Sequence, residues 1–469
     1  MVNEVRKYST TIFIFLICLV FTLLHSNNFF FWDTITEVSL PANFYYDTNF
    51  HSSFFNDPKA IGHQTLVPLY LAAVWKIFGK SLLISHLAFF PFVVGLTCLV
   101  CRYIRRAGLP QSMSLLILIL VILDPALVSQ ASLLTFDTPQ IFFFLLCIAG
   151  YSERKNLLLL IAFTGLCLTS LRGVFCGIGL IIYYLIDNYI NHRRLKIKDA
   201  LLFLPGVFSF MIFLWLFLRS KNWSIWDLIV SLWSGSSEFT SFGRLFKSSL
   251  IFGWRLVDYG RVGLISVFIF LVFKVIRSKF YYDEFFRQTF LIGLSQIVVF
   301  FPVTLIFTKF IGHRYLIPVI IPVAICTGYW ILKYSGYPKM IFTIVLTLMI
   351  SGYFWIYPVK IAQGWDATPA HWPYYKIRNE MISWMKNDSI PIAQTGSFFP
   401  NLASFKLTDL SDATLSFKEA ELSKDNYVLF SNIFNIPDYK IDELFNDSRW
   451  KKIKKIERMN VYMILFKRE

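Results

Sequence analysis

The sequence predicts an all-α multi-span membrane protein with about eleven transmembrane helices and a small α/β domain at the C-terminal end. Of its 469 residues, 56% are hydrophobic and only 16% are charged, and the mean hydropathy is +0.56. A single soluble core could not hide this much apolar surface from water. Lipid is therefore the expected solvent of most of the chain.

Apolar runs of about 20 residues, the length that crosses a bilayer as a helix, set the expected spans. The first run follows Lys and Arg residues and has no small-residue cleavage site behind it, so we expect a retained signal anchor. Residues 1–357 form the expected transmembrane domain. Its spans are expected at residues 10–31, 82–101, 112–131, 138–151, 157–171, 174–190, 200–218, 261–276, 289–308, 315–332 and 339–357.

Basic residues gather in alternate short connections, and this pattern predicts the orientation. The positive-inside rule makes these connections and the N-terminus cytoplasmic, and an odd number of spans leaves the C-terminus extracytoplasmic. The formal net charge of +16 follows from these loops. No nucleic-acid partner is expected, because the charges form no continuous face. We expect an integral multi-pass protein of a bacterial inner membrane.

Two long connections, 33–81 and 219–260, fall on the outer side in this arrangement. The apolar part of the first, between Gly62 and Gly79, is too short to span and suits a helix at the membrane interface. Beyond residue 358 the composition turns polar, so residues 358–469 are expected to form a soluble α/β domain on the outer face. Its expected elements are a helix at Tyr374–Lys386, strands at Ile390–Ser397 and Tyr427–Phe434, and a hairpin turning at Met459-Asn460.

Five ionisable side chains emerge together at the outer face: Asp33, His63, Asp137, Arg172 and Arg314. Such groups are costly at a membrane boundary without a partner or a role. Asp33 follows an aromatic run, and a partly desolvated carboxylate there could take the proton of an acceptor hydroxyl. The alternative is an interfacial acid in contact with water.

Asp137 and His63 each have a structural and a functional interpretation. Asp137 precedes the Thr-Pro that starts a helix, so it is either an N-cap or a second acid that shares a metal or a proton with Asp33 or orients an acceptor. Alternatively, Asp33 and Asp137 are both solvated loop acids. His63 opens the interfacial helix and could cap it, bind a metal with Asp33, or bind a phosphate or sugar hydroxyl. A divalent metal near Asp33 therefore stays open, although the sequence requires no cofactor.

Arg172 and Arg314 suit a phosphate, because a guanidinium offers a planar fork of donors. Arg172 lies between two short spans, and His313 and Arg314 together open a late span. Snorkelling of these side chains to lipid headgroups is the alternative. The sequence has no Gly-rich phosphate loop, nucleophile elbow or zinc spacing, which argues against a nucleotide substrate. A lipid-phosphate substrate needs none of these motifs.

The order of these features resembles the GT-C superfamily of integral-membrane glycosyltransferases, particularly the branch of the protein O-mannosyltransferases and the lipid A aminoarabinose transferase. Asp33 follows the first span, and Asp137 stands before Pro139 at the outer start of the fourth. Arg172 lies between the fifth and sixth spans, and an Arg-Tyr-Leu-x-Pro run begins at Arg314. The resemblance covers most of residues 1–357.

This resemblance implies an inverting transfer of a sugar from a polyprenyl-phosphate donor to an acceptor hydroxyl. Asp33 would be the general base, Asp137 a supporting acid, and Arg172 and Arg314 the phosphate clamp. The implied partners are the donor, membrane lipids and a glycan, lipid or protein acceptor. One departure is that the Asp-Glu pair of many members is Asp33-Thr34 here. The second acid of this loop could then be one of three residues: Glu37, Asp47 or Asp57.

A transporter or flippase of a lipid-linked or sugar substrate is the alternative function. Such a protein is expected to have discontinuous helices, polar groups near the middle of the membrane and often two related halves. The ionisable residues here gather at one face, and the sequence shows no related halves. This pattern favours the enzyme.

Overall fold

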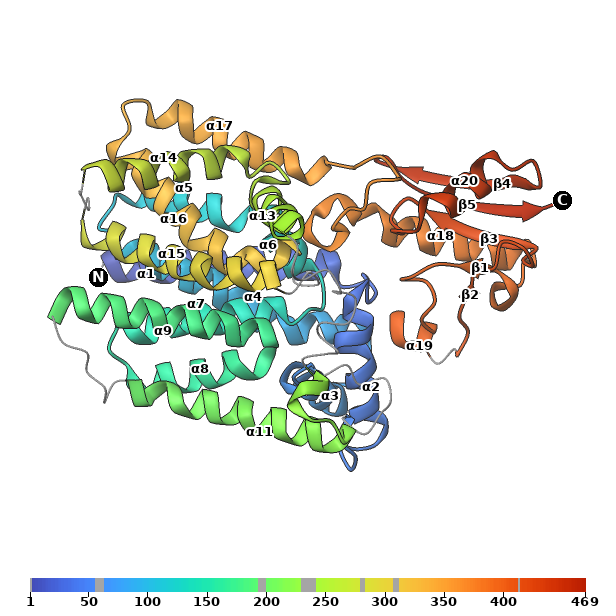
Figure 1. Cartoon of the computed structure of the whole chain (residues 1–469), viewed down its shortest axis with the longest axis horizontal. Coiled ribbons are helices and arrows are strands. Elements are labelled where there is room, and N and C mark those ends of the chain that lie inside the picture. The colour runs from blue at the N-terminus through green and yellow to red at the C-terminus, as the bar shows by residue number, and fades with distance from the viewer. Residues whose placement is uncertain are drawn as a thin grey trace.

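The computed structural model describes residues 2–54, 63–192, 200–228, 242–278, 283–306, 312–411 and 414–469. Long helices form a bundle, and a small sheet lies beyond one end of it (Figure 1). Two short helices, α2 (Leu40–Asp47) and α3 (Leu66–Phe78), lie at that same end. The bundle contains α1 (Val2–His25), α4 (Leu82–Arg105), α5 (Gln111–Ile122), α6 (Pro125–Ser132), α7 (Asp137–Ser152), α8 (Asn156–Thr169), α9 (Leu171–His192), α11 (Leu204–Lys221), α13 (Phe242–Val257), α14 (Val262–Ser278), α15 (Glu284–Ile306), α16 (Ile317–Tyr334) and α17 (Pro338–Ser351).

Five helices of the described part are long and apolar enough to cross a membrane, which supports an integral membrane protein. Two bent helix pairs raise this number to as many as seven. The expected eleven spans are not confirmed by this count. Several expected spans are shorter apolar helices, such as Asn156–Thr169 and Pro338–Phe354, and the expected interfacial helix is Leu66–Phe78.

The two bent pairs are joined by a buried ion pair. α5 and α6 are bent by 68° around Asp124, and α13 and α14 are bent by 111° around the turn that contains Arg261. Nε and Nη2 of Arg261 donate hydrogen bonds of 2.6 Å to the two carboxylate oxygens of Asp124. Asp124 also caps α6 by accepting from the backbone N–H of Leu127. The expected span 112–131 is therefore broken at Asp124.

Turn chemistry explains the second bend. Gly260 has a φ of +77°, and a Cβ on it would lie 1.8 Å from the carbonyl oxygen of Leu348. Only glycine fits so close an approach of two backbones. Residues 229–241 of the expected outer connection 219–260 lie outside the described residues, and α13 occupies much of the remainder.

The C-terminal segment folds around a five-stranded mixed sheet of order β2-β1-β3-β5-β4. The expected helix at 374–386 is confirmed as α18 (Pro373–Asn387), and the expected hairpin turns at Met459 and Asn460, both with positive φ. The expected strand at 390–397 is reduced to its last two residues. The elements are β1 (Gly396–Ser397), α19 (Phe405–Thr408), β2 (Lys418–Glu419), β3 (Tyr427–Ser431), α20 (Asp438–Asn446), β4 (Trp450–Arg458) and β5 (Val461–Arg468).

This sheet shares its hydrophobic core with the segment that follows α1. Phe29 and Phe31 pack in the same cluster as residues of α18, β3 and β5. The backbone N–H of Phe30 donates to the carbonyl oxygen of Thr408 at 3.0 Å, and the Ser39 hydroxyl donates to that of Leu407 at 2.6 Å. The C-terminal segment therefore holds the chain around Asp33 in place.

We expect Asp124→Ala to destabilise the protein strongly, because it leaves the fully buried Arg261 without its partner. Breaking a buried pair from one side costs about 3–5 kcal/mol. The thermal midpoint of the purified protein should fall well below that of the wild type. Asp442→Ala is the control, since Asp442 is about half exposed and pairs with the exposed Lys360. Equal midpoints for the two variants would contradict the role assigned to the pair.

Candidate functional site

Arg314 lies among four carboxylates from separate parts of the chain. Its Nη2 is 2.5 Å from Oδ2 of Asp33 and 3.9 Å from Oε1 of Glu37. Its Nε is 3.7 Å from Oδ2 of Asp137, and its Nη1 is 2.9 Å from Oδ2 of Asp366. The guanidinium is buried, so this charge is compensated by the protein rather than by water.

Arg172 is the second cation of this site, which we call the Arg314 cluster. Its Nη1 donates a hydrogen bond of 2.5 Å to Oδ1 of Asp137, so that Asp137 lies between the two arginines. Its Nη2 is 3.8 Å from Oε2 of Glu37 and has no hydrogen-bond partner among the described residues. The guanidinium also lies over the ring of Tyr315, 4.2 Å from its centroid. One buried donor is therefore left for an anion.

The local fold brings the first two acids together. Trp32 has a φ of 50°, a left-handed backbone that bulky residues rarely adopt, and it turns the chain sharply after the aromatic run. The Thr34 hydroxyl fixes the turn by donating to the carbonyl oxygen of Phe31 and accepting from its N–H. A π-helical turn, Ile35–Ser39, follows and carries Glu37 to the same guanidinium as Asp33.

Asp137 is not an N-cap. The cap position of α7 is Phe136, and Asp137 is the first residue inside the helix. Its carboxylate faces the arginines, at 2.5 Å from Arg172 and 3.7 Å from Arg314. The capping interpretation is therefore wrong, although a carboxylate in the first turn is also favoured by the helix dipole.

Asp366 is a member of this cluster that the sequence did not reveal. It lies in a single 3₁₀ turn, Trp365–Ala367, which precedes α18, and its backbone carbonyl accepts from Ser129 and Gln130 of α6 at 2.6 Å. The sequence analysis placed no candidate residue in the C-terminal segment. The available signal was weak: an acid beside a tryptophan soon after the last apolar run.

Glu37 is the second acid of the first loop at this site. Asp47 instead forms a surface pair with Lys406, and Asp57 lies outside the described residues. Burial raises the pKa of Glu37 to about 8, against the opposing effect of Arg314 and Arg172. Burial also raises the pKa of Asp366. Glu37 is therefore largely protonated at neutral pH.

Asp33 is the accessible acid of the cluster. Its side chain is 42% exposed, against 10% for Glu37, 3% for Asp137 and 18% for Asp366. A solvent-borne acceptor can therefore reach Asp33 far more easily than the other carboxylates.

The structure brings His63 to the cluster and His313 to a different place. Nε2 of His63 is 3.4 Å from Oε1 of Glu37, and burial lowers the pKa of this imidazole below its usual range. Nε2 of His313 lies 2.5 Å from Oδ2 of Asp258 and 3.0 Å from Nη1 of Arg255. His313 therefore adjoins Arg314 in sequence without joining its carboxylates.

The carboxylates of the cluster do not form a metal site. Asp33 and Asp137 direct their oxygens at guanidinium groups, which hold the places a cation would need. In the described part of the chain, no group of three or more His, Cys, Asp and Glu side chains could hold a metal ion. The sequence left a metal near Asp33 open, and these residues do not fit one.

We expect Glu37→Gln to change the pH dependence of stability. A carboxyl whose pKa is raised on folding destabilises the protein increasingly as pH rises from about 4.5 towards 8, because the unfolded chain releases its proton first. The amide cannot ionise, so the thermal midpoint of the variant should exceed that of the wild type at pH 8.5 by a few degrees. At pH 4.5 the two should agree. The same gap at both pH values would contradict the shift.

Comparison with known proteins gives one informative likeness. No protein-family model and no curated protein matches the sequence. Among solved structures, the chain is similar to ArnT from Cupriavidus metallidurans, crystallised with undecaprenyl phosphate bound. The alignment has a TM-score of 0.53 and 11% identity, and it covers 97% of this chain and 98% of ArnT. The chain therefore has the GT-C type of fold that the sequence resemblance implied.

Proposed function

We propose that this protein is a membrane glycosyltransferase that moves a sugar from a polyprenyl-phosphate donor to an acceptor hydroxyl. The observation that carries the proposal is the Arg314 cluster, where two buried guanidiniums adjoin one accessible carboxylate. The ArnT-like fold supports it, since ArnT was crystallised with a polyprenyl phosphate.

Arg172 and Arg314 hold the donor phosphate in this proposal. Nη2 of Arg172 is buried and has no hydrogen-bond acceptor among the described residues, so it would donate to a phosphate oxygen. Arg314 would add charge that compensates the phosphate as it leaves. Asp137 orients both guanidiniums, and protonation of Glu37 removes one negative charge from the path of the phosphate.

Asp33 is the proposed general base. Its hydrogen bond to Arg314 is the contact that an arriving phosphate would compete for, and loss of this contact frees the carboxylate oxygen to accept a proton. The acceptor oxygen then attacks the anomeric carbon from the face opposite the phosphate. Its proton goes to Asp33, and the carbon–oxygen bond to the phosphate breaks with its electron pair on the phosphate, which inverts the anomeric centre.

The finer topology belongs to the same proposal. The cluster would face the extracytoplasmic side of a bacterial inner membrane, with the N-terminus cytoplasmic, the C-terminal segment 358–469 outside and about eleven spans between them. The sugar is a hexose or a pentose. The acceptor is a glycan, a lipid or a protein.

One observation favours the transporter or flippase as a second candidate. Discontinuous helices are typical of transporters, and the structure has two bent pairs. The bends are tied to each other by Asp124 and Arg261, and the charged site adjoins the C-terminal segment rather than the middle of the bundle. Chemistry separates the two candidates, because a flippase moves the donor without cleaving it.

We expect Asp33→Asn to lower sugar transfer by at least about 100-fold, the usual contribution of a general base. The assay would give the reconstituted full chain undecaprenyl-phosphate-linked hexoses and pentoses as donors and a mixture of glycans, lipids and proteins as acceptors, and would follow release of undecaprenyl phosphate. Asp47→Asn is the matched control, since Asp47 is an exposed acid of the same loop. Unchanged release by the Asp33 variant would remove Asp33 from the mechanism. Movement of intact donor across the membrane would favour the flippase.

We expect Arg172→Lys to weaken binding of undecaprenyl phosphate by about tenfold, because an ammonium cannot contact both Asp137 and a phosphate in the fork geometry. Equilibrium binding to the purified protein would measure this. Arg219→Lys is the control, since Arg219 is an exposed arginine at the end of α11. Equal affinities of the two variants would exclude the assigned phosphate contact.

A further inference from the structure

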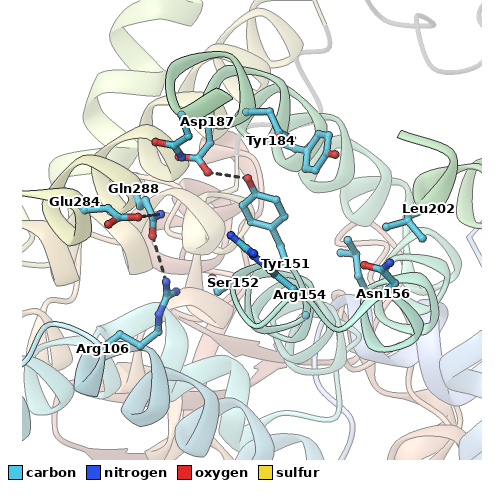
Figure 2. A pocket seen from close by; sticks show the side chains of 14 residues that line it. Arg106, Tyr151, Ser152, Arg154, Asn156, Tyr184, Asp187, Leu202, Glu284 and Gln288 are labelled. Carbon is cyan, nitrogen blue, oxygen red and sulfur yellow. Dashed lines mark hydrogen bonds between the residues drawn. The ribbon is translucent and has the colours of Figure 1, made fainter. Parts of the chain in front are cut away.

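A polar cavity of about 590 Å³ lies at the end of the helix bundle away from the sheet (Figure 1). Figure 2 shows the side chains that line it. The ends of α4, α7 and α9 and the starts of α8 and α15 form its walls. Its volume is within the range of ligand sites, about 300–1,000 Å³. The sequence analysis and the proposed reaction assign it no role.

The cavity and the Arg314 cluster occupy opposite ends of the same helices. α7 carries Asp137 in its first turn and Tyr151 in its last, and α9 carries Arg172 in its first turn and Asp187 near its end. The helical rise from Arg172 to Asp187 is about 22 Å. By the distribution of basic loops, this end of the bundle is the one expected to be cytoplasmic.

The inner wall carries a negative charge. Asp187 is 3% exposed, and its oxygens accept hydrogen bonds from the Tyr151 hydroxyl at 2.7 Å and from Nδ2 of Asn191 at 3.1 Å. None of the described Lys, Arg or His side chains forms an ion pair with it. A buried carboxylate whose described partners are all neutral is costly, so a cationic ligand group would be stabilised here.

Asn188, the next residue, carries a buried polar atom without a hydrogen-bond partner among the described residues. Asn188 is 6% exposed and lines the cavity. Its Nδ2 has no hydrogen-bond partner among the described residues. A buried amide donor without a partner is uncommon in folded proteins, and a ligand oxygen in the cavity would satisfy it.

Two cations stand at the exposed side of the cavity. Nη2 of Arg106 donates to Oε1 of Gln288 at 3.3 Å, and Gln288 in turn donates to Glu284 (Figure 2). Arg154 also lines the cavity, and neither arginine forms an ion pair within the described part of the chain. Guanidinium groups without carboxylate partners suit a phosphate.

Apolar residues connect the cavity with the lipid-facing surface. Leu159 of α8 and Leu202, which precedes α11, form part of the lining. Their neighbours Leu157 and Leu201 are among the most exposed apolar side chains of this end, at 71% and 54%. A ligand with acyl chains can therefore place its head in the cavity and its chains along α8 and α11.

We propose that this cavity binds the headgroup of an aminoalkyl phospholipid of the membrane leaflet opposite the Arg314 cluster. The phosphate contacts Arg106 and Arg154, the ammonium contacts Asp187, and Nδ2 of Asn188 donates to a headgroup oxygen. The site favours a zwitterionic headgroup, because its arginines can bind the phosphate while Asp187 binds the ammonium of the same ligand. This inference does not depend on the proposed sugar transfer.

The test is lipid binding by native mass spectrometry of the purified full chain with added phosphatidylethanolamine or phosphatidylglycerol. We expect preferential binding of phosphatidylethanolamine, by about tenfold, as a well-placed ammonium–carboxylate contact would give. Arg106→Ala should weaken binding of both lipids. Asp187→Asn keeps the shape of the wall and should remove the preference alone.

Arg105→Ala is the matched control, because Arg105 is the neighbouring exposed arginine of α4 and does not line the cavity. It should bind both lipids as the wild type does. Wild-type binding by both Arg106→Ala and Asp187→Asn would overturn the proposal, and so would equal affinity of the wild type for the two lipids. If soluble O-phosphoethanolamine binds as tightly as the lipid, the claim that the ligand is a membrane lipid is contradicted. Arg106 is exposed, so its variant keeps the test informative if Asp187→Asn fails to fold.

Discussion

The structure around the site depends on the need to compensate one buried positive charge. A guanidinium removed from water costs several kcal/mol unless carboxylates and hydrogen bonds surround it, and Arg314 is 3% exposed. Its partners come from the loop after α1, the start of α7 and the 3₁₀ turn before α18. Segments from the beginning, the middle and the end of the chain must therefore meet at one residue. This requirement and the shared aromatic core both hold the C-terminal segment against the loop that follows α1.

Much of this arrangement was predictable from the sequence. The physical reason is that a charged residue beside an apolar run shows in the sequence that its burial has to be compensated. A carboxylate or guanidinium at the end of an apolar run has no obvious means of hydration, so Asp33, Asp137, Arg172 and Arg314 stood out against the apolar sequence around them. The alternation of basic connections predicted which helix ends share one end of the bundle, and the structure brings these four side chains together there. The pairing inside the cluster did not follow, because the sequence shows that a charge needs compensation but not which residue provides it. Asp366 was missed for this reason: in a polar segment an aspartate is ordinary.

The number of spans could not be predicted as well from the sequence. Hydropathy reports the total apolar length and cannot distinguish a straight helix from two bent halves, so the run 112–131 looked continuous although Asp124 breaks it. The structure separates His313 from the acids around Arg314, because neighbours in a 3₁₀ turn point in different directions: His313 contacts Asp258 while Arg314 faces the acids. Near-neighbours in sequence share a site only when the local helix geometry places them on one face.

The pairing of Asp124 with Arg261 also sets a condition on biosynthesis. The two residues are 137 positions apart, so the ribosome completes α5 and α6 long before it makes the arginine. The buried pair can form only once α13 and α14 have been made. The docking of α5 and α6 against these two helices is therefore completed late in synthesis.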